Sequence, residues 1–499
     1  MDAEIHQLEN LGTYIKVKIP KDRVAINCKW VFRLKRDAEG KIVRHKARLV
    51  AKGFSQIPRI DFFETFAPVM RLDTLQLLLA IAATYGLVAH VVDIVGAYLN
   101  GELKEQIYMK QILRYEDGTD SVLLLQRTLY GLRQSGRVWN EKLNKTFIQL
   151  GFTRLFSDQC VYIRHIRNKL VIIGVHVDDM LILASDDEAM AEFKREFGQK
   201  FDISDLGELK QIVGFEVQRD LKKGTIHLTQ NQYVGKILDR FGMSKSTPVK
   251  MPLDPNVKLT KTPEGEHHEI PEYAAAIGSL MYAAIGTRPD IAYAVQHLSQ
   301  FTSNPSPAHW SAIKRVFRYL NGTREYGITY GGGNIVPILE GFSDADWGNS
   351  DLDRKSISGY IFLFGNAPIS WASRKQRTVA VSTMEAEYMA ASLATREAIW
   401  LRTLLTEIGL LQNKPTQLNI DNQSAIDFSK NQGSHSKSKH IDIQHHFVRE
   451  RLGDNSIIIE HCASEDNLAD VFTKALPRPA HERFTSRIGI DSELRGSVE

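Results

Sequence analysis

The stretch KLVIIGVHVDDMLILAS at residues 169–185 places two adjacent acids between two apolar runs. Two apolar runs, LVIIGV and MLILA, flank the adjacent carboxylates Asp178 and Asp179. Short apolar runs rich in Val and Ile predict two buried strands joined as a hairpin. Removing a carboxylate from water costs on the order of several kcal/mol unless a cation or hydrogen-bond donors compensate it. Because Asp is also common at turns, an ordinary turn and a cation site both stay open at this point.

The sequence around the hairpin alternates strand and helix patterns. A second hairpin is predicted over 25–54, with the turn DAEG between its strands. The remaining patterns predict helices over 71–86, 137–151 and 186–201 and an apolar strand over 87–95. This order predicts an α+β domain over residues 1–229.

Two further regions follow. Residues 230–334 carry helical patterns cut by Pro and Gly, with a polar, Pro-containing linker at 246–272. Strands return from residue 335, followed by a long helix over 384–409, two strands and a last helix over 464–476. We therefore predict a compact α/β domain over 335–480 and a C-terminal tail over 481–499.

The composition describes a globular chain. It has 499 residues, of which 43% are hydrophobic and 24% charged, and its net charge is +4. Apolar stretches are too short to span a bilayer, so no membrane partner is expected. The three cysteines are far apart and the first residues are polar, which predicts a reducing, cytoplasmic location without a signal peptide.

A first group of acids emerges if the strand over 87–95 neighbours the hairpin. Asp93 lies near the end of that strand, so it would converge with Asp178 and Asp179. Mg²⁺ is bound by a few carboxylates together with substrate phosphates. Two such ions serve phosphoryl transfer by activating one oxygen and stabilising another.

Four stretches, in this order, resemble the reverse transcriptases of copia-type retrotransposons. They are KWVFRLKRDAEGKIVRHKARLVAKGFSQ (29–56), VVDIVGAYLNGELKEQIYM (91–109), LYGLRQSGRVWN (129–140) and HVDDM (176–180). The resemblance implies a right-hand polymerase of fingers, palm and thumb. It also implies that Asp93 and Asp178 hold two Mg²⁺ or Mn²⁺ ions, with Asp179 in support. His176 departs from the family pattern, which usually has Tyr there.

The same resemblance implies four nucleotide- or template-binding residues. Tyr98 matches the aromatic side chain beneath the incoming sugar, where it would exclude a 2′-hydroxyl. Gln134 matches the glutamine beside the nucleotide pocket, and Lys46 and Arg48 match basic positions near its phosphates. Without the motifs, the simpler interpretations are a core tyrosine, a loop glutamine and a solvated strand face.

A second group of acids lies at element edges in the last domain: Asp344, Glu387, Asp421 and Asp470. Alone, such acids are ordinary in an α/β domain. The sequence stretches around them resemble the ribonuclease H domain of copia-type retrotransposons: FSDADWGNSDLDRKSISGY (342–360), VSTMEAEYMA (381–390), IDNQSAI (420–426) and DNLADVFTKAL (466–476). The resemblance implies that these four residues hold two Mg²⁺ or Mn²⁺ ions that direct water onto an RNA phosphodiester.

Two neighbouring acids compete for these roles. Glu385 and Glu387 point to roughly opposite sides of a helix, and the family pattern selects Glu387. It likewise selects Asp344 over Asp346. Histidines over 435–446 lack zinc-like spacing, so we interpret that stretch as a basic, substrate-facing segment.

The middle region also resembles the segment that joins polymerase and nuclease in copia-type polyproteins. Within it, Lys314, Arg315 and Arg318 fall within about one helical turn, which suits either phosphate contacts or a solvated face.

The resemblance implies an RNA-directed DNA polymerase joined to a ribonuclease H. Expected partners are an RNA template, a DNA or RNA primer, deoxynucleoside triphosphates and an RNA–DNA hybrid, in the cytoplasm or in retrotransposon particles. The alternatives are a decayed or truncated copy that keeps the fold without activity, and a nucleic-acid-binding protein without catalysis. Intact acid groups argue against the second alternative, because carboxylates repel phosphates unless a metal intervenes.

Overall fold

The computed structural model describes residues 1–36, 42–166, 168–333, 336–348, 353–365, 367–430 and 442–492. The chain forms two compact units. The N-terminal unit holds Met1–Met70, His90–Arg154 and Gln159–Gly207. The C-terminal unit holds Arg71–Ala89, Leu155–Asp158 and the residues from Glu208 onward. These bounds differ from the predicted domain bounds, because the helix predicted over 71–86 joins the C-terminal unit.

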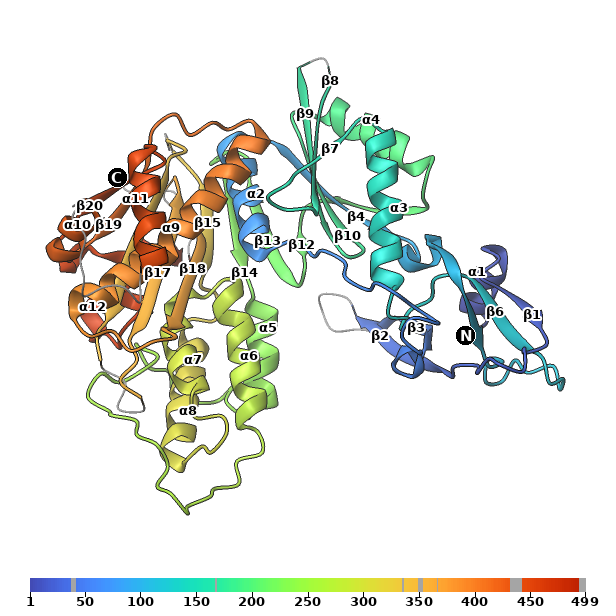
Figure 1. The fold of residues 1–499 in the computed structure, drawn as a ribbon, viewed down its shortest axis with the longest axis horizontal. Helices are drawn as coiled ribbons and strands as arrows, with labels where there is room; N and C mark the ends of the chain where they lie inside the picture. Colours follow the sequence, from blue (N-terminus) through green and yellow to red (C-terminus); the bar gives the residue numbers. More distant parts are fainter. Residues whose placement is uncertain are drawn as a thin grey trace. The chain divides into compact units, whose positions relative to one another are not determined.

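The N-terminal unit contains three sheets and three α-helices (Figure 1). One sheet has the order β11-β4-β10-β9-β8-β7, another β1-β6-β5, and a third consists of β2 and β3. Its helices are α1 (Asp2–Asn10), α3 (Ser135–Gln149) and α4 (Asp187–Gly198), with 3₁₀ turns η1 (Gly53–Ser55) and η2 (Ala97–Asn100). Its strands are β1 (Tyr14–Val17), β2 (Cys28–Arg36), β3 (Ile42–Ala51), β4 (Val88–Ile94), β5 (Glu102–Met109), β6 (Val122–Arg127), β7 (Thr153–Arg154), β8 (Val161–Ile166), β9 (Lys169–His176), β10 (Asp179–Ala184) and β11 (Ile203–Glu208).

The six-stranded sheet carries the opening hairpin. Strands β9 and β10 are antiparallel, and their pairing runs from Val171 opposite Ala184 to His176 opposite Asp179. Every residue of 171–175 and 180–184 is buried. Aromatic rings of α3 and α4 pack together beside this sheet, with Phe147 stacked on Phe197 at 5.5 Å between centroids. The hairpin is therefore anchored in an apolar core, as its two apolar runs predicted.

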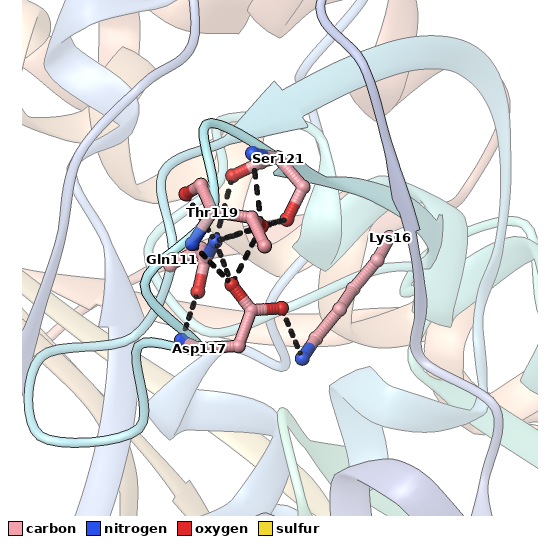
Figure 2. A network of polar contacts seen from close by, with 5 residues as sticks. All are labelled: Lys16, Gln111, Asp117, Thr119 and Ser121. Carbon is pink, nitrogen blue, oxygen red and sulfur yellow. Dashed lines mark hydrogen bonds and ion pairs between the residues drawn. The ribbon is translucent and has the colours of Figure 1, made fainter.

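A polar network closes the loop between β5 and β6 (Figure 2). Lys16 on β1 donates to Asp117 Oδ2 at 2.8 Å, and Gln111 Nε2 donates to Asp117 Oδ1 at 2.8 Å. The same amide also contacts Thr119 and Ser121. Hydrogen bonds from Lys16, Thr119 and Gln111 hold the pKa of Asp117 far below its usual value. The network orders an exposed loop and carries no carboxylate that lacks a partner.

The C-terminal unit contains two five-stranded sheets and nine α-helices among the described residues. The sheet orders are β12-β13-β14-β15-β21 and β18-β17-β16-β19-β20. Its helices are α2 (Leu72–Thr84), α5 (Asn231–Arg240), α6 (Tyr273–Gly286), α7 (Ala292–Ser299), α8 (Pro307–Gly322), α9 (Thr383–Ile408), α10 (Gln423–Lys430), α11 (Asp442–Gly453) and α12 (Arg478–Arg487), of which α2 comes from the earlier part of the chain. Its 3₁₀ turns are η3 (Pro289–Ile291), η5 (Ser464–Asp466) and η6 (Leu468–Phe472). Its strands are β12 (Gln211–Ile212), β13 (Phe215–Asp220), β14 (Thr225–Thr229), β15 (Gly327–Gly331), β16 (Leu339–Asp346), β17 (Ile357–Phe364), β18 (Ala367–Lys375), β19 (Thr416–Ile420), β20 (Ile457–His461) and β21 (Ile490–Asp491).

The second of these sheets is mixed. Strands β18, β17 and β16 run antiparallel, and β19 and β20 are added in parallel to β16. Helix α9 packs against β16 and β17 (Figure 1). Parallel strands need crossover connections, which α9 and the segment with α10 and α11 supply. The carboxyl ends of β16 and β19 therefore lie at the same edge of the sheet.

Helices α5 to α8 share an apolar core that includes Tyr273, Leu280, Phe317 and Leu320. A fully buried ion pair tightens it, because both nitrogens Nε and Nη2 of Arg288 contact Asp290, at 2.9 and 2.7 Å. The Tyr319 hydroxyl also donates to Asp290, at 2.6 Å. The predicted linker over 246–272 has neither helix nor strand.

Two expectations for the C-terminal end were wrong. The segment predicted as a tail over 481–499 is folded as far as residue 492, because α12 continues from Arg478 and β21 pairs with β15. The last predicted helix, over 464–476, is instead two short 3₁₀ turns, η5 and η6. Close contact with the sheet explains the second difference, as described below. None of the described helices is long and apolar enough to cross a bilayer.

Candidate active sites

Three of the four predicted nuclease acids meet at one edge of the mixed sheet. Asp344 lies on β16, Glu387 on the first turns of α9, and Asp421 directly after β19. One oxygen from each carboxylate lies within 4.8 Å of the others, and we call these three residues the acid cluster. The chain supplies them from three elements, because β16 and β19 end together and α9 crosses β16.

Asp470, the fourth predicted acid, lies on η6 beside the acid cluster. Two contacts hold η6 against the sheet. The Asn467 side chain caps η6 by accepting from Ala469 N at 3.1 Å, and its amide donates to Ser343 O at 3.0 Å. Gly359, opposite Asp344 in the β16–β17 register, leaves the space that η6 occupies. Because η6 lies this close to β17, the chain forms a short 3₁₀ turn here in place of the helix predicted over 464–476.

Further contacts fix the orientation of the acids. The Thr473 hydroxyl donates to Asp344 Oδ2, and the Ser464 hydroxyl donates to Asp421 Oδ2 at 2.6 Å. Lys474 forms an ion pair with Asp470 at 2.9 Å. Asn467 and Lys474 were not predicted as site residues from the sequence. The four-residue spacing between Asp470 and Lys474, typical of helical ion pairs, was the available signal for Lys474.

The site is electrostatically unfavourable without a compensating cation. Burial, together with the carboxylates of Asp344 and Asp421, raises the pKa of Glu387 to about 10. Burial and Asp344 raise the pKa of Asp470 to about 7, against the effect of Lys474. Burial also raises the pKa of Asp344. Like charges held this close in a buried site resist joint ionisation.

The donor set fits a hard divalent cation. Glu387 Oε2 is buried and accepts no hydrogen bond from any described residue. A buried acceptor without a partner costs stability unless a ligand satisfies it. Carboxylate oxygens are the ligands that Mg²⁺ and Mn²⁺ take in proteins. The residues present therefore fit a metal site.

The competing acids lie elsewhere. Glu385 is buried at the start of α9, where its carboxylate accepts from Val381 N at 2.9 Å and its own N–H donates to the Ser382 hydroxyl. It serves as part of the helix cap, as expected of a structural acid. Asp346 lies two residues beyond Asp344 and is outside the acid cluster. Residues 431–441 lie outside the described residues, and with them most of the stretch interpreted as substrate-facing.

The polymerase acids meet in the N-terminal unit. Val177 and Asp178 form a two-residue turn, with Asp179 paired opposite His176 at the start of β10. The backbone N–H of Ile94, next to Asp93, donates to Asp178 O at 3.4 Å. Asp93 and Asp178 line one pocket of about 250 Å³. The turn interpretation and the site interpretation of the opening stretch are therefore both compatible with this geometry.

The turn is conformationally unusual. Val177 has φ 65°, a left-handed conformation that costs a β-branched residue on the order of 1–2 kcal/mol. Buried Trp139 on α3 compensates by donating its indole N–H to Val177 O at 2.9 Å. Trp139 thereby fixes the position of Asp178, a role that the sequence analysis did not assign to it.

Basic and aromatic side chains surround the same pocket. Lys46 and Arg48 on β3 line it together with Tyr130. The Arg48 guanidinium lies over the Tyr130 ring at 4.6 Å, and Tyr98 packs edge-on against Tyr130 at 5.1 Å. Burial raises the pKa of Tyr98, and the nearby Asp178 raises it further. Tyr98 thus lies near Asp178, although it is not one of the residues that line the pocket.

Gln134 lies apart from this pocket. It is buried, its oxygen accepts from Gln56 Nε2 at 3.0 Å, and its amide donates to Asp61 O at 2.8 Å. Gln134 here joins the loop before α3 to the loop after β3. The predicted contact of Gln134 with a nucleotide stays a prediction, as does the supporting role of Asp179.

The chain thus carries an acid-bearing hairpin in one unit and an acid cluster on a mixed sheet in the other. Residues 11–255 match the family model described as "Reverse transcriptase (RNA-dependent DNA polymerase)". The fold is similar to a foamy viral protease-reverse transcriptase solved with an RNA/DNA hybrid, with a TM-score of 0.50 and 13% identity over 96% of this chain and 55% of that one.

Sequence relatives then identify the family. The chain is 40% identical to a retrovirus-related Pol polyprotein from transposon TNT 1-94 of Nicotiana tabacum, over 99% of the chain and 38% of that polyprotein. It is 31% identical to a putative transposon Ty5-1 protein of Saccharomyces cerevisiae, over 61% of the chain and 99% of that protein. The chain belongs to the copia-type retrotransposon Pol family. It spans only 38% of the tobacco polyprotein's length.

Proposed function

We propose that this chain copies RNA into DNA and degrades the RNA strand of the resulting hybrid. The observation that carries the nuclease half is the convergence of Asp344, Glu387 and Asp421 within 4.8 Å, beside Asp470. The shared pocket of Asp93, Asp178, Lys46 and Arg48 supports the polymerase half. Membership in the copia-type Pol family supports both halves together.

In the nuclease site, the acid cluster and Asp470 would hold two Mg²⁺ or Mn²⁺ ions. When bound, such a pair activates an attacking water and stabilises the leaving oxygen of the RNA phosphodiester. Thr473 and Ser464 hold Asp344 and Asp421 in position through their hydroxyl groups. The ammonium group of Lys474 partly offsets the negative charge beside Asp470 and so limits repulsion of the incoming phosphate.

In the polymerase site, Asp93 and Asp178 would hold two ions of the same kind, with Asp179 in support. Lys46 and Arg48 would bind the phosphates of a deoxynucleoside triphosphate, since charge-assisted contacts to phosphate are strong. Tyr130 keeps the Arg48 guanidinium at the pocket by lying beneath it. Tyr98 would lie under the sugar, where its ring discriminates against a 2′-hydroxyl.

Hybrid cleavage tests the nuclease half. The wild-type chain with Mg²⁺ is expected to cleave a labelled RNA–DNA hybrid, and Asp421→Asn is expected to abolish cleavage. Asp427→Asn is the matched control, because Asp427 is exposed on α10 and lies outside the acid cluster. Absence of cleavage by the wild type in any divalent metal would contradict the proposal and favour a decayed copy or a non-catalytic binding protein.

Primer extension on an RNA template tests the polymerase half. Asp178→Asn is expected to abolish metal-dependent extension. The control Asp187→Asn changes an exposed acid at the start of α4 and is expected to leave extension unchanged. Equal extension by the wild type and Asp178→Asn would show that this hairpin does not carry the reaction.

A further inference from the structure

A groove of about 460 Å³ lies in the C-terminal unit between the linker, α7, α8 and the segment after η6. Asp254 and Lys258 come from the linker and Arg315 and Arg318 from α8, while Asp346 and Lys474 complete this polar lining. We call it the basic groove. Its volume falls in the range of about 300–1,000 Å³ that is usual for ligand sites. Figure 1 shows α7 and α8 side by side below the mixed sheet.

The basic groove favours an anion. Its lining has four cationic side chains and two carboxylates. His297 also lines it but stays neutral at pH 7, because burial lowers its pKa to about 4. The excess of positive charge lies along one cavity rather than on scattered surface positions. A polyanion would be attracted to such a cavity.

Two of the cations have unused hydrogen-bonding capacity. Arg315 Nε is buried and makes no hydrogen bond with any described residue. The Arg315 guanidinium lies 3.7 Å from Asp254, which is an ion pair beyond hydrogen-bond distance. Lys258 is exposed and forms no ion pair with the described part of the chain. Phosphate oxygens would satisfy Lys258 and the accessible part of the Arg315 side chain, which is 26% exposed.

Two residues of the basic groove lie next to the nuclease acids. Lys474 lines the groove and also forms the ion pair with Asp470. Asp346 lines the groove and follows Asp344 on β16 by two residues. Tyr293 and His297, stacked at 5.6 Å, add an aromatic surface to the same lining. Cations together with aromatic rings beside the acid cluster suit a nucleic-acid strand better than an acidic peptide.

We propose that the basic groove binds the sugar–phosphate backbone of a nucleic-acid strand outside the bond cleaved at the acid cluster. Lys258 and Arg315 contact its phosphates, and Lys474 lies between the groove and the cleavage centre. This proposal rests on the proposed nuclease function and extends it to a substrate-binding surface. It gives Arg315 and Arg318 distinct roles, because Arg318 Nε already donates to Thr247 O at 2.7 Å and ties α8 to the linker.

Equilibrium binding tests the groove without catalysis. The full chain carrying Asp421→Asn is titrated against a fluorescent RNA–DNA hybrid in Mg²⁺, followed by anisotropy at several salt concentrations. Lys258→Ala and Arg315→Met are each expected to weaken binding about 5- to 10-fold, because each removes a charged donor to phosphate. Each is also expected to reduce the slope of log K against log salt by about 0.7–0.9.

Matched controls are Lys250→Ala and Lys261→Ala, which remove exposed charges from the same linker outside the groove lining. The proposal predicts wild-type affinity and slope for both. Equal affinity and slope for the groove variants and the controls would overturn it. The proposal would also be overturned if Lys258→Ala and Arg315→Met lost binding to a labelled polyglutamate peptide while their binding to the hybrid stayed unchanged.

The two proposals fail separately. If the wild-type chain does not cleave hybrid but the groove variants still lower the salt slope, the nuclease proposal fails and the groove stands. If the wild type cleaves and the groove variants bind normally, the groove proposal fails alone. Lys258→Arg keeps the charge and is expected to restore binding, which separates a phosphate contact from a folding defect.

Discussion

Gly359→Ala tests the close contact that places Asp470 beside the acid cluster. A Cβ atom at Gly359 would lie 2.7 Å from Thr473 Cγ2, 2.8 Å from Phe472 Cβ and 3.0 Å from Ala469 O. One of these atoms is backbone and another is a Cβ, so rotating a side chain cannot relieve the overlap. Either η6 or β17 must shift by several tenths of an ångström.

The consequence is a double loss in the C-terminal unit. Overpacking of this kind costs about 1–3 kcal/mol of the free energy of unfolding. Movement of η6 would also displace Asp470 and weaken the Thr473 hydrogen bond to Asp344. Since misplacement by about 1 Å can cost about 100-fold in rate, we expect a loss of hybrid cleavage of at least about 10-fold. Primer extension should be unchanged, because the polymerase pocket lies in the N-terminal unit.

Gly278→Ala is the matched control. Gly278 is exposed within α6, and a Cβ atom there would meet nothing within 4 Å. The same chemical change should therefore stabilise the chain by up to about 1 kcal/mol and leave cleavage unaltered. Denaturant unfolding and hybrid cleavage are measured on both variants. Wild-type stability and cleavage in Gly359→Ala would refute the idea that tight packing of η6 positions Asp470.

Three other predictions follow from named contacts. Trp139→Phe removes the hydrogen bond to Val177 O and is expected to lower the free energy of unfolding by about 1 kcal/mol. Primer extension should fall even under conditions in which the variant remains fully folded. Equal extension by the variant and the wild type would argue against a positioning role for Trp139. Arg288→Met leaves Asp290 buried without its cation and should cost about 3–5 kcal/mol by denaturant unfolding, whereas adding Asp290→Leu should recover part of that loss. Burial raises the pKa of Asp470 to about 7 and that of Glu387 to about 10, so the metal-free chain should lose stability in thermal melts as pH rises above about 4. Asp470→Asn should remove its part of this loss, which falls between about pH 4 and 7, and Mg²⁺ should oppose the remainder.

Much of the fold followed from local patterns. Apolar runs around Asp178 predicted the hairpin of β9 and β10, and periodicity predicted α3, α4 and α9 within a few residues. Such patterns report which face of an element is buried, so they locate elements without their neighbours. They could not show that α2 packs with β14, β15 and β18 in the C-terminal unit, because that choice depends on long-range contacts.

Local sequence shows which acids are available and, through family motifs, which of them are expected to serve catalysis. Which of these acids meet depends on the packing of distant segments. Parallel pairing of β16 and β19 brings Asp344 and Asp421 to one edge, and the turn locked by Trp139 places Asp178 beside Asp93 in a pocket. Distances between residues far apart in sequence follow from strand order and packing, and local sequence does not encode these. The same reason explains Asn467 and Gly359, whose roles appear only where η6 meets the sheet.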